Sequence, residues 1–283
     1  MQSLQTVFAY TDDGLIIDVP TRWSPRKVFC KDSPAQNDAS GRLYAVKYRR
    51  DPVSTAAAIS EVISHALLKM IGLRTLDAVL VEVGPQLSQS YRQSGILDYA
   101  IDGGLHFGTR LRLDFMPGPV THWDFLARPE ELIFIWAADC WLMNLDREVY
   151  GNTLLEQDNG KWHLIPADQS DCLLGSSSFS DGSYMPRSRS YSSAPHLPML
   201  ERALLEKGPA PLQRMIGLIH EASSRIPEAM ARVPSAWWSR AGVTPHALEA
   251  CLRERANRIS VLVQLDKWKS MPYGTDGITL LDL

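Results

Sequence analysis

Cysteine is scarce in this sequence and never closely spaced. The four cysteines lie far apart among 283 residues, and none belongs to a C-x-x-C motif. This pattern is typical of free thiols in a reducing compartment, and it argues against a disulfide framework or a zinc site. We therefore expect a cytoplasmic protein. The cysteines are Cys30, Cys140, Cys172 and Cys251.

Long hydrophobic runs are also missing. The most apolar stretch, LIFIWAADCWLM at 132–143, contains Asp139 and is too short to cross a bilayer. The first residues, MQSLQTVFAYTDDG, lack the basic and apolar regions of a signal peptide. We interpret 132–143 as a buried helix, and we expect a soluble protein with no membrane partner.

No excess of one charge is present either. The formal net charge is −3 and the isoelectric point is about 6.2. A general nucleic-acid binder would show a basic excess, so we expect no direct contact with nucleic acid. The 45% hydrophobic content is sufficient for a sizeable core, in one large domain or in two lobes.

The first part of the chain is rich in β-forming residues. Several segments cluster or alternate Val, Ile, Phe and Tyr between turn residues, which is typical of strands. These segments are VFAYT, GLIIDV, RKVFCK, RLYAVKY, TLDAVLVEV and HFGTRLRLDFM. One helix interrupts them: Ser54 or Thr55 can cap its start, and Gly72 can close its end.

From residue 129 onward the pattern becomes helical. PEELIFIWAADCWLMNL at 129–145 begins with Pro and Glu, which suit a helix N-terminus. A hairpin follows, with TLLE and KWHLIP as strands around a DNG turn. The serine-rich stretch 175–193 precedes further helices, and the last long one begins at Thr244 and Pro245.

Two candidate site residues lie in the β-rich part. Lys47 ends the strand RLYAVKY, and Glu61 lies beside the apolar stripe of the following helix. A glutamate at that edge can reach the strand lysine. Viewed alone, Lys47 could equally be exposed on an edge strand, and Glu61 could be a solvated helix charge.

Three more candidates surround the hairpin. Asp146 follows the apolar helix, Asn152 precedes the first hairpin strand and Asp168 follows the second. Because the hairpin strands are antiparallel, Asn152 and Asp168 meet at its open end and can share a metal ion. The alternatives are that Asp146 pairs with Arg147, that Asp168 is an ordinary turn residue, or that Asp171 binds the metal.

The chain order Lys, Glu, Asp, Asn, Asp suits phosphoryl transfer. That chemistry needs a cation to hold a polyphosphate, a carboxylate to orient the attacking hydroxyl and hard oxygen ligands for Mg²⁺. The same order over two lobes is found in protein kinases, where the strand lysine contacts the α- and β-phosphates.

Several motifs are similar to those of one kinase family. WLMNLDR, GNTLL and LIPADQS resemble the catalytic segments of the HipA-like kinases, particularly the shorter HipA-like kinase domain. Upstream, TRWSPRKV, SEVISHALLKMIGL and LHFGTRL resemble other segments of the same family. The resemblance covers most of residues 20–172, and beyond them the chain matches only in being helical.

The resemblance implies an α+β, bilobal, protein-kinase-like fold. It implies a β-rich, nucleotide-binding N-lobe at 1–116 with one αC-like helix, a hinge at 117–128 and a mainly helical C-lobe at 129–283 carrying the catalytic hairpin. It also implies an ATP- and Mg²⁺-dependent kinase that phosphorylates a protein on Ser or Thr, with an antitoxin-type regulator as a possible partner.

The resemblance also assigns a role to each candidate. Lys47 binds the phosphates and Glu61 holds Lys47. Asp146 is the catalytic base, and Asn152 and Asp168 are the metal ligands.

The sequence departs from protein kinases in three respects. The spacing from Asp146 to Asn152 is one residue longer, and Arg147 follows the aspartate, an order that also occurs in phosphatidylinositol kinases. No Gly-rich loop is found; 32–41 and the Ser-Pro at 24–25 are both candidates for a phosphate-covering turn. A lipid or small-molecule kinase and a nucleotide-binding pseudokinase therefore remain alternatives.

The stretch 175–193 is interpreted as a regulatory loop, a docking strip or a disordered surface loop.

Overall fold

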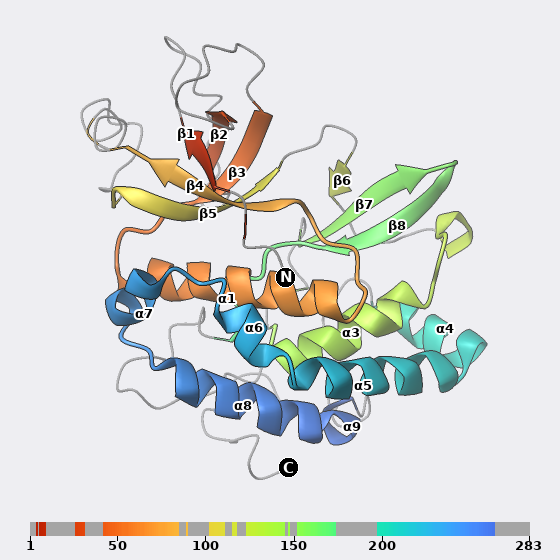
Figure 1. The fold of residues 1–283 in the computed structure, drawn as a ribbon. Helices are drawn as coiled ribbons and strands as arrows, with labels where there is room; N and C mark the ends of the chain where they lie inside the picture. Colours follow the sequence, from red (N-terminus) through yellow and green to blue (C-terminus); the bar gives the residue numbers. More distant parts are fainter. Residues whose placement is uncertain are drawn as a thin grey trace.

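The computed structural model describes most of the strands and helices of the chain. The described residues are 4, 6–9, 26–31, 42–84, 89, 102–110, 115–117, 123–144, 147, 152–173 and 197–263. They form a mixed α/β fold in which two small sheets lie over a layer of helices (Figure 1). The predicted strand GLIIDV, both candidate phosphate-covering turns and the serine-rich stretch lie outside the described residues.

The larger sheet is a closed barrel with the strand order β1-β2-β3-β5-β4. All neighbouring pairs are antiparallel except β1 and β4, which are parallel. In the pairing of β3 with β5, Lys47 lies opposite Phe107. The strands are β1 (Thr6–Ala9), β2 (Arg26–Lys31), β3 (Arg42–Lys47), β4 (Ala78–Val83) and β5 (Gly104–Arg110).

Gly108 allows β4 and β5 to pack closely. A Cβ atom built on Gly108 would lie 2.6 Å from the Val81 Cγ2 atom, and Val81 is fully buried and β-branched. We therefore expect Gly108→Ala to destabilise the protein by about 1–3 kcal/mol, measured as a lower urea midpoint. The matched control is Gly217→Ala, where the new methyl group meets nothing within 4 Å. On that exposed helical position we expect a gain of up to about 1 kcal/mol, and equal midpoints for the two variants would contradict the prediction.

Helix α1 (Pro52–Met70) begins one turn earlier than the sequence predicts. Its cap is Asp51, whose Oδ1 accepts the Ser54 N–H at 2.7 Å, while Ser54 Oγ accepts the Asp51 N–H at 3.1 Å. Pro52, with no N–H to satisfy, occupies the first helical position, which the apolar stripe alone did not reveal. At the other end, Gly72 adopts a φ of +80° just beyond the helix, as expected.

Helix α1 lies between the barrel and the C-terminal helices (Figure 1). It contacts β5 on one side and α6 (Ile226–Met230) and α7 (Ser235–Ala241) on the other. Nearly all of its length is therefore buried, including the polar side chains of Ser60 and Glu61. A glutamate in such a position requires a specific partner.

The second sheet has the order β6-β7-β8 and is antiparallel throughout. Its strands are β6 (Phe115–Pro117), β7 (Thr153–Asp158) and β8 (Lys161–Pro166). The predicted hairpin is confirmed: Asn159 and Gly160 form its turn with φ values of 50° and 75°, as a two-residue type I′ turn requires. The segment 106–116, predicted as one strand, is instead divided between β5 and β6, which belong to different sheets.

The helical layer is built around α3 (Glu131–Leu142), all of whose residues are buried. The predicted helix at 129–145 is thus confirmed, with Met143 ending it in a left-handed conformation. In the described residues, no helix is long and apolar enough to cross a membrane. The remaining helices are η1 (Trp123–Phe125), α4 (Leu197–Lys207), α5 (Ala210–Ser223), α8 (Pro245–Asn257) and α9 (Ile259–Leu262).

Candidate functional site

Three of the predicted site residues meet around one ammonium group. The Lys47 Nζ atom, at the end of β3, lies 3.1 Å from Oε1 of Glu61 on α1. The same atom contacts Oδ1 of Asp168, which follows β8, and donates to Oγ of Ser170 at 3.1 Å. The sequence distance from Lys47 to Asp168 is 121 residues, so this meeting is a product of the fold.

The three side chains of the cluster differ in their exposure to solvent. The Glu61 side chain is 5% exposed, whereas those of Lys47 and Asp168 are 22% and 25% exposed. Glu61 therefore forms the buried end of the cluster, and Lys47 and Asp168 form an end that solvent or a ligand can reach. A polar ligand at the open end would meet both a cation and a carboxylate.

The local backbone turns the Asp168 side chain toward Lys47. Asp168 has a φ of 50°, a left-handed conformation that Asp tolerates better than most residues. Its Oδ1 atom also accepts the Ser170 N–H at 3.2 Å and contacts the Ser170 hydroxyl group. This turn identifies Asp168, rather than Asp171, as the carboxylate that completes the cluster.

Each member of the cluster has a displaced pKa. Burial would lower the pKa of Lys47, but the carboxylates of Glu61 and Asp168 outweigh it and hold that pKa above its usual value. Burial raises the pKa of Glu61 to about 7 despite the nearby ammonium group. For Asp168, Lys47 and Ser170 outweigh burial and lower the pKa to about 2. At neutral pH Lys47 is thus positive and Asp168 negative.

Asn152 and Asp168 occupy the same end of the hairpin. Thr153 pairs with Pro166, and the Ala167 N–H donates to the Asn152 carbonyl oxygen at 2.9 Å. Asn152 thus precedes β7 where Asp168 follows β8, as the antiparallel pairing predicts. Asp146, the predicted catalytic base, lies outside the described residues.

The donor set at this end of the hairpin fits a magnesium ion. Asp168 offers a carboxylate that remains charged, and Asn152 offers an amide oxygen; both are hard ligands of the kind Mg²⁺ prefers. In the part of the chain that the structure describes, no group of three or more His, Cys, Asp or Glu side chains could hold a metal. One carboxylate with waters and substrate phosphates is the usual arrangement for Mg²⁺, so that observation is compatible with these ligands.

A buried network that the sequence analysis missed supports this region. Arg147 forms an ion pair with Asp139 of α3, and both side chains are 1% exposed. Arg147 also reaches the backbone of Asn152 and Ala167 and the side chain of Gln169. The only available signal was Asp139 itself, a charge within an otherwise apolar helix, which requires a buried partner.

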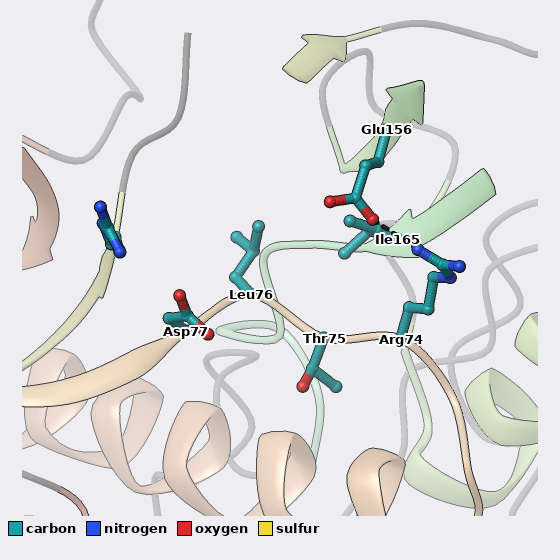
Figure 2. Close-up of a pocket in the computed structure, with 7 residues that line it drawn as sticks. Arg74, Thr75, Leu76, Asp77, Glu156 and Ile165 are labelled. Atoms are coloured by element: carbon teal, nitrogen blue, oxygen red, sulfur yellow. Dashed lines mark hydrogen bonds and ion pairs between the residues drawn. The ribbon is translucent and has the colours of Figure 1, made fainter. Parts of the chain in front are cut away.

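A separate polar cleft lies between the two sheets (Figure 2). The segment after α1 contributes Arg74 and Asp77, and Glu156 of β7 and Ile165 of β8 face it. Arg74 Nη1 forms an ion pair with Glu156 Oε2 at 2.6 Å, which links α1's end to the hairpin. The Arg74 side chain is 40% exposed, so this pair contributes at most about 1 kcal/mol to stability.

The His106 side chain forms hydrogen bonds with the backbone of Arg49, just after Lys47, and of Asp102. Its Nδ1 atom accepts the Arg49 N–H at 2.9 Å, and its Nε2–H donates to the Asp102 carbonyl oxygen at 2.9 Å. Both bonds together require the neutral imidazole. Burial, aided by the Arg49 charge, accordingly lowers the pKa of His106 to about 4.

This arrangement predicts a pH dependence of stability. Because the pKa of His106 is lower in the folded state, the unfolded state binds more protons between about pH 6.5 and 4, and stability falls as the pH falls through that window. Between pH 7 and 5 the expected loss from His106 is about 2 kcal/mol. Glu61, whose folded pKa is raised, acts in the opposite direction as the pH falls from about 7.

A substitution of His106 separates its contribution to the pH dependence of stability from that of Glu61. His106→Asn retains an acceptor for the Arg49 N–H but does not titrate. Urea unfolding at pH 7 and pH 5 is expected to show a smaller acid-induced loss in this variant than in the wild type, by about 2 kcal/mol. An identical loss in both proteins would contradict the assignment of a neutral His106.

Two solved structures are among those that are similar to this chain. No family model matches the chain, and no curated protein matches it. The Helicobacter pylori proinflammatory kinase CtkA has 13% identity and a TM-score of 0.48, over 88% of this chain and 93% of CtkA. HipA of Shewanella oneidensis, solved with HipB and operator DNA, has 13% identity and a TM-score of 0.43, over 93% of this chain and 69% of that one.

With TM-scores below 0.5 and low identity, these similarities do not carry the functional assignment. The assignment depends instead on the Lys47 cluster.

Proposed function

We propose that this protein is an ATP- and Mg²⁺-dependent phosphotransferase with a bilobal, kinase-like organisation. In this proposal residues 1–116 form the nucleotide-binding N-lobe, 117–128 the hinge and 129–283 the catalytic C-lobe. The nucleotide binds beside the Lys47 ammonium group, next to the end of the hairpin that carries Asn152 and Asp168.

One observation carries the proposal. A strand lysine, a buried helix glutamate and a carboxylate after a hairpin converge, although they come from three different elements. Phosphoryl transfer depends on positioning and on charge, and these are the groups that it requires. An ordinary surface lysine would not be held between a 5%-exposed glutamate and a second carboxylate.

Each residue of the cluster has a defined role in the proposal. Lys47 neutralises and orients the α- and β-phosphates, and Glu61 fixes the lysine so that its ammonium group projects toward them. Asn152 and Asp168 would hold Mg²⁺, which would supply positive charge to offset the negative charge that develops on the transferred phosphate. Lys47 then exchanges its contact with Asp168 for a contact with the nucleotide.

Asp146 is the proposed catalytic base. It orients the acceptor hydroxyl group and accepts its proton as the oxygen bonds to the γ-phosphorus and the bond to the ADP oxygen breaks. This role depends on its sequence position, between the apolar helix and Asn152.

The proposed acceptor is a Ser or Thr side chain of a protein in the cytoplasm, with an antitoxin-type protein as a possible regulator. These two points depend on the motif resemblance to HipA-like kinases. A lipid or small-molecule acceptor is the alternative that the order Asp146-Arg147 permits.

The proposal is tested with radiolabelled ATP. Pure wild-type protein and Asp146→Ala are incubated with Mg²⁺ and labelled ATP, first alone and then with cell lysate, a phosphoinositide or an aminoglycoside. Label in a protein band with the wild type only supports the proposal, and label in lipid or small molecule alone replaces the acceptor class. Equal inactivity of both proteins, with Mg²⁺-dependent ATP binding retained, would instead indicate a pseudokinase.

A further inference from the structure

The Arg147 guanidinium group uses all five of its N–H donors in the structure. Arginine has five such donors in a fixed plane, and each one here has its own acceptor. The acceptors are Asp139 Oδ2 at 2.9 Å from Nε, Asp139 Oδ1 at 3.0 Å from Nη2, Gln169 Oε1 at 3.2 Å from Nη2, the Ala167 carbonyl oxygen at 2.7 Å from Nη1, and the Asn152 carbonyl oxygen.

From this geometry we infer that Arg147 is a positioning residue that holds Asn152 and Asp168 in place for phosphoryl transfer. The inference rests on the proposed function, because it assigns Arg147 a task in that reaction. Arg147 itself is 3% exposed, so it acts through the residues it holds and does not touch a substrate.

Asp139 gives the network a rigid base. It is 2% exposed and lies on α3, all of whose residues are buried. The bidentate ion pair fixes the plane of the guanidinium group, because each Asp139 oxygen accepts a hydrogen bond from it. The remaining three donors therefore point in directions set by α3.

Two of those three donors, both on Nη1, bind backbone carbonyl oxygens on the two sides of the proposed metal site. One carbonyl belongs to Asn152 and the other to Ala167, and the Ala167 N–H in turn donates to the Asn152 carbonyl at 2.9 Å. Arg147 thus bridges the two backbone segments at the open end of the hairpin. A change at this point alters the separation of the two segments that carry the proposed ligands.

Asp168 lies between two residues that Arg147 binds. The guanidinium group holds the carbonyl of Ala167 before it and the side chain of Gln169 after it. Gln169 Oε1 also accepts from Asn144 Nδ2 at 3.3 Å and from the Cys172 thiol at 3.2 Å. With both neighbours fixed, the left-handed Asp168 is directed toward Lys47.

Lysine cannot reproduce this arrangement. An ammonium group has three donors without planar order, so it can retain the charge beside Asp139 but not all five contacts. Arg147→Lys therefore separates the positioning role from the simple need for a buried positive charge.

Arg255 is a matched control for this substitution. It is also buried, at 7% exposure, and donates from Nε to the Trp141 carbonyl oxygen at 2.8 Å and from Nη2 to that of Cys140. Arg255 thus binds the same helix, α3, but reaches neither hairpin strand in these contacts. Arg255→Lys measures the general cost of replacing a buried arginine.

The kinetic test compares the two variants. In Arg147→Lys we expect kcat for phosphate transfer to fall about 100-fold, because misplaced reacting groups cost that much. The Mg²⁺ concentration for half-maximal rate is expected to rise about 10-fold or more, because supporting residues tune metal affinity. In Arg255→Lys, per folded molecule, both values stay within about twofold of the wild type.

A second readout does not depend on activity. Hydrogen exchange is expected to be faster at the Ala167 and Ser170 amides in Arg147→Lys than in the wild type, and unchanged there in Arg255→Lys. Normal exchange at these amides, or an unchanged Mg²⁺ requirement, would overturn the positioning role. If wild-type protein transfers no phosphate, the proposed function fails, and the exchange result still decides whether Arg147 orders the two segments.

Discussion

Replacing Lys47 with Met is expected to reduce phosphate transfer by about 1,000-fold while leaving the protein folded. The methionine fills the same space but cannot neutralise phosphate oxygens. It also leaves Glu61 without its cation, and the pKa of that carboxyl group, already raised by burial to about 7, then rises further. Glu61 is thus protonated at neutral pH in the variant, which limits the cost to stability.

The measurement is the initial rate with labelled ATP, accompanied by circular dichroism and urea unfolding. Lys69→Met is the control, because Lys69 is exposed on the same helix that carries Glu61. Lys47→Arg provides a second variant that keeps the positive charge should the methionine variant fold poorly. A rate within tenfold of the wild type in Lys47→Met would contradict the assigned role.

Asp168→Asn is expected to remove the dependence of nucleotide binding on Mg²⁺. The amide is nearly the same size as the carboxylate but carries no charge, and Mg²⁺ sites of this kind depend on one or two carboxylates. Wild-type protein should bind an ATP analogue more tightly in Mg²⁺ than in chelator, whereas the variant should bind it equally in both. The rate of transfer is expected to fall by about 1,000-fold.

Asp171→Asn is the control for that experiment. The sequence leaves Asp171 as an alternative ligand, but the Lys47 ammonium group contacts Asp168. The control should therefore retain both its Mg²⁺ dependence and most of its rate. The reverse pattern, a large loss in Asp171→Asn and little in Asp168→Asn, would transfer the ligand role to Asp171.

The strand, helix and hairpin that carry the candidate site residues could be predicted from the sequence, because each has a strong local pattern. Lys47 ends an alternating strand, Glu61 follows on an apolar helix, and the Asn159-Gly160 turn defines a hairpin whose ends carry Asn152 and Asp168. In each case the signal lies within a few residues. Hydrophobic periodicity and turn chemistry are sufficient to place such elements.

The supporting network could not be predicted in this way. The contacts of Arg147 with Asp139, Ala167 and Gln169 cross 8 to 22 positions of sequence, so no local pattern reveals them. A buried charge within an apolar helix indicates that a partner exists, but several basic residues are available in the chain. Only the tertiary structure selects Arg147.

The most direct test of the account is a crystal structure of the protein with Mn²⁺ and a non-hydrolysable ATP analogue. The account predicts an anomalous manganese peak in contact with the Asp168 carboxylate and the Asn152 amide oxygen. Lys47 should lie against the α- and β-phosphates of the same nucleotide while keeping its ion pair with Glu61. A nucleotide bound elsewhere, or one bound here with manganese distant from both Asn152 and Asp168, would contradict it.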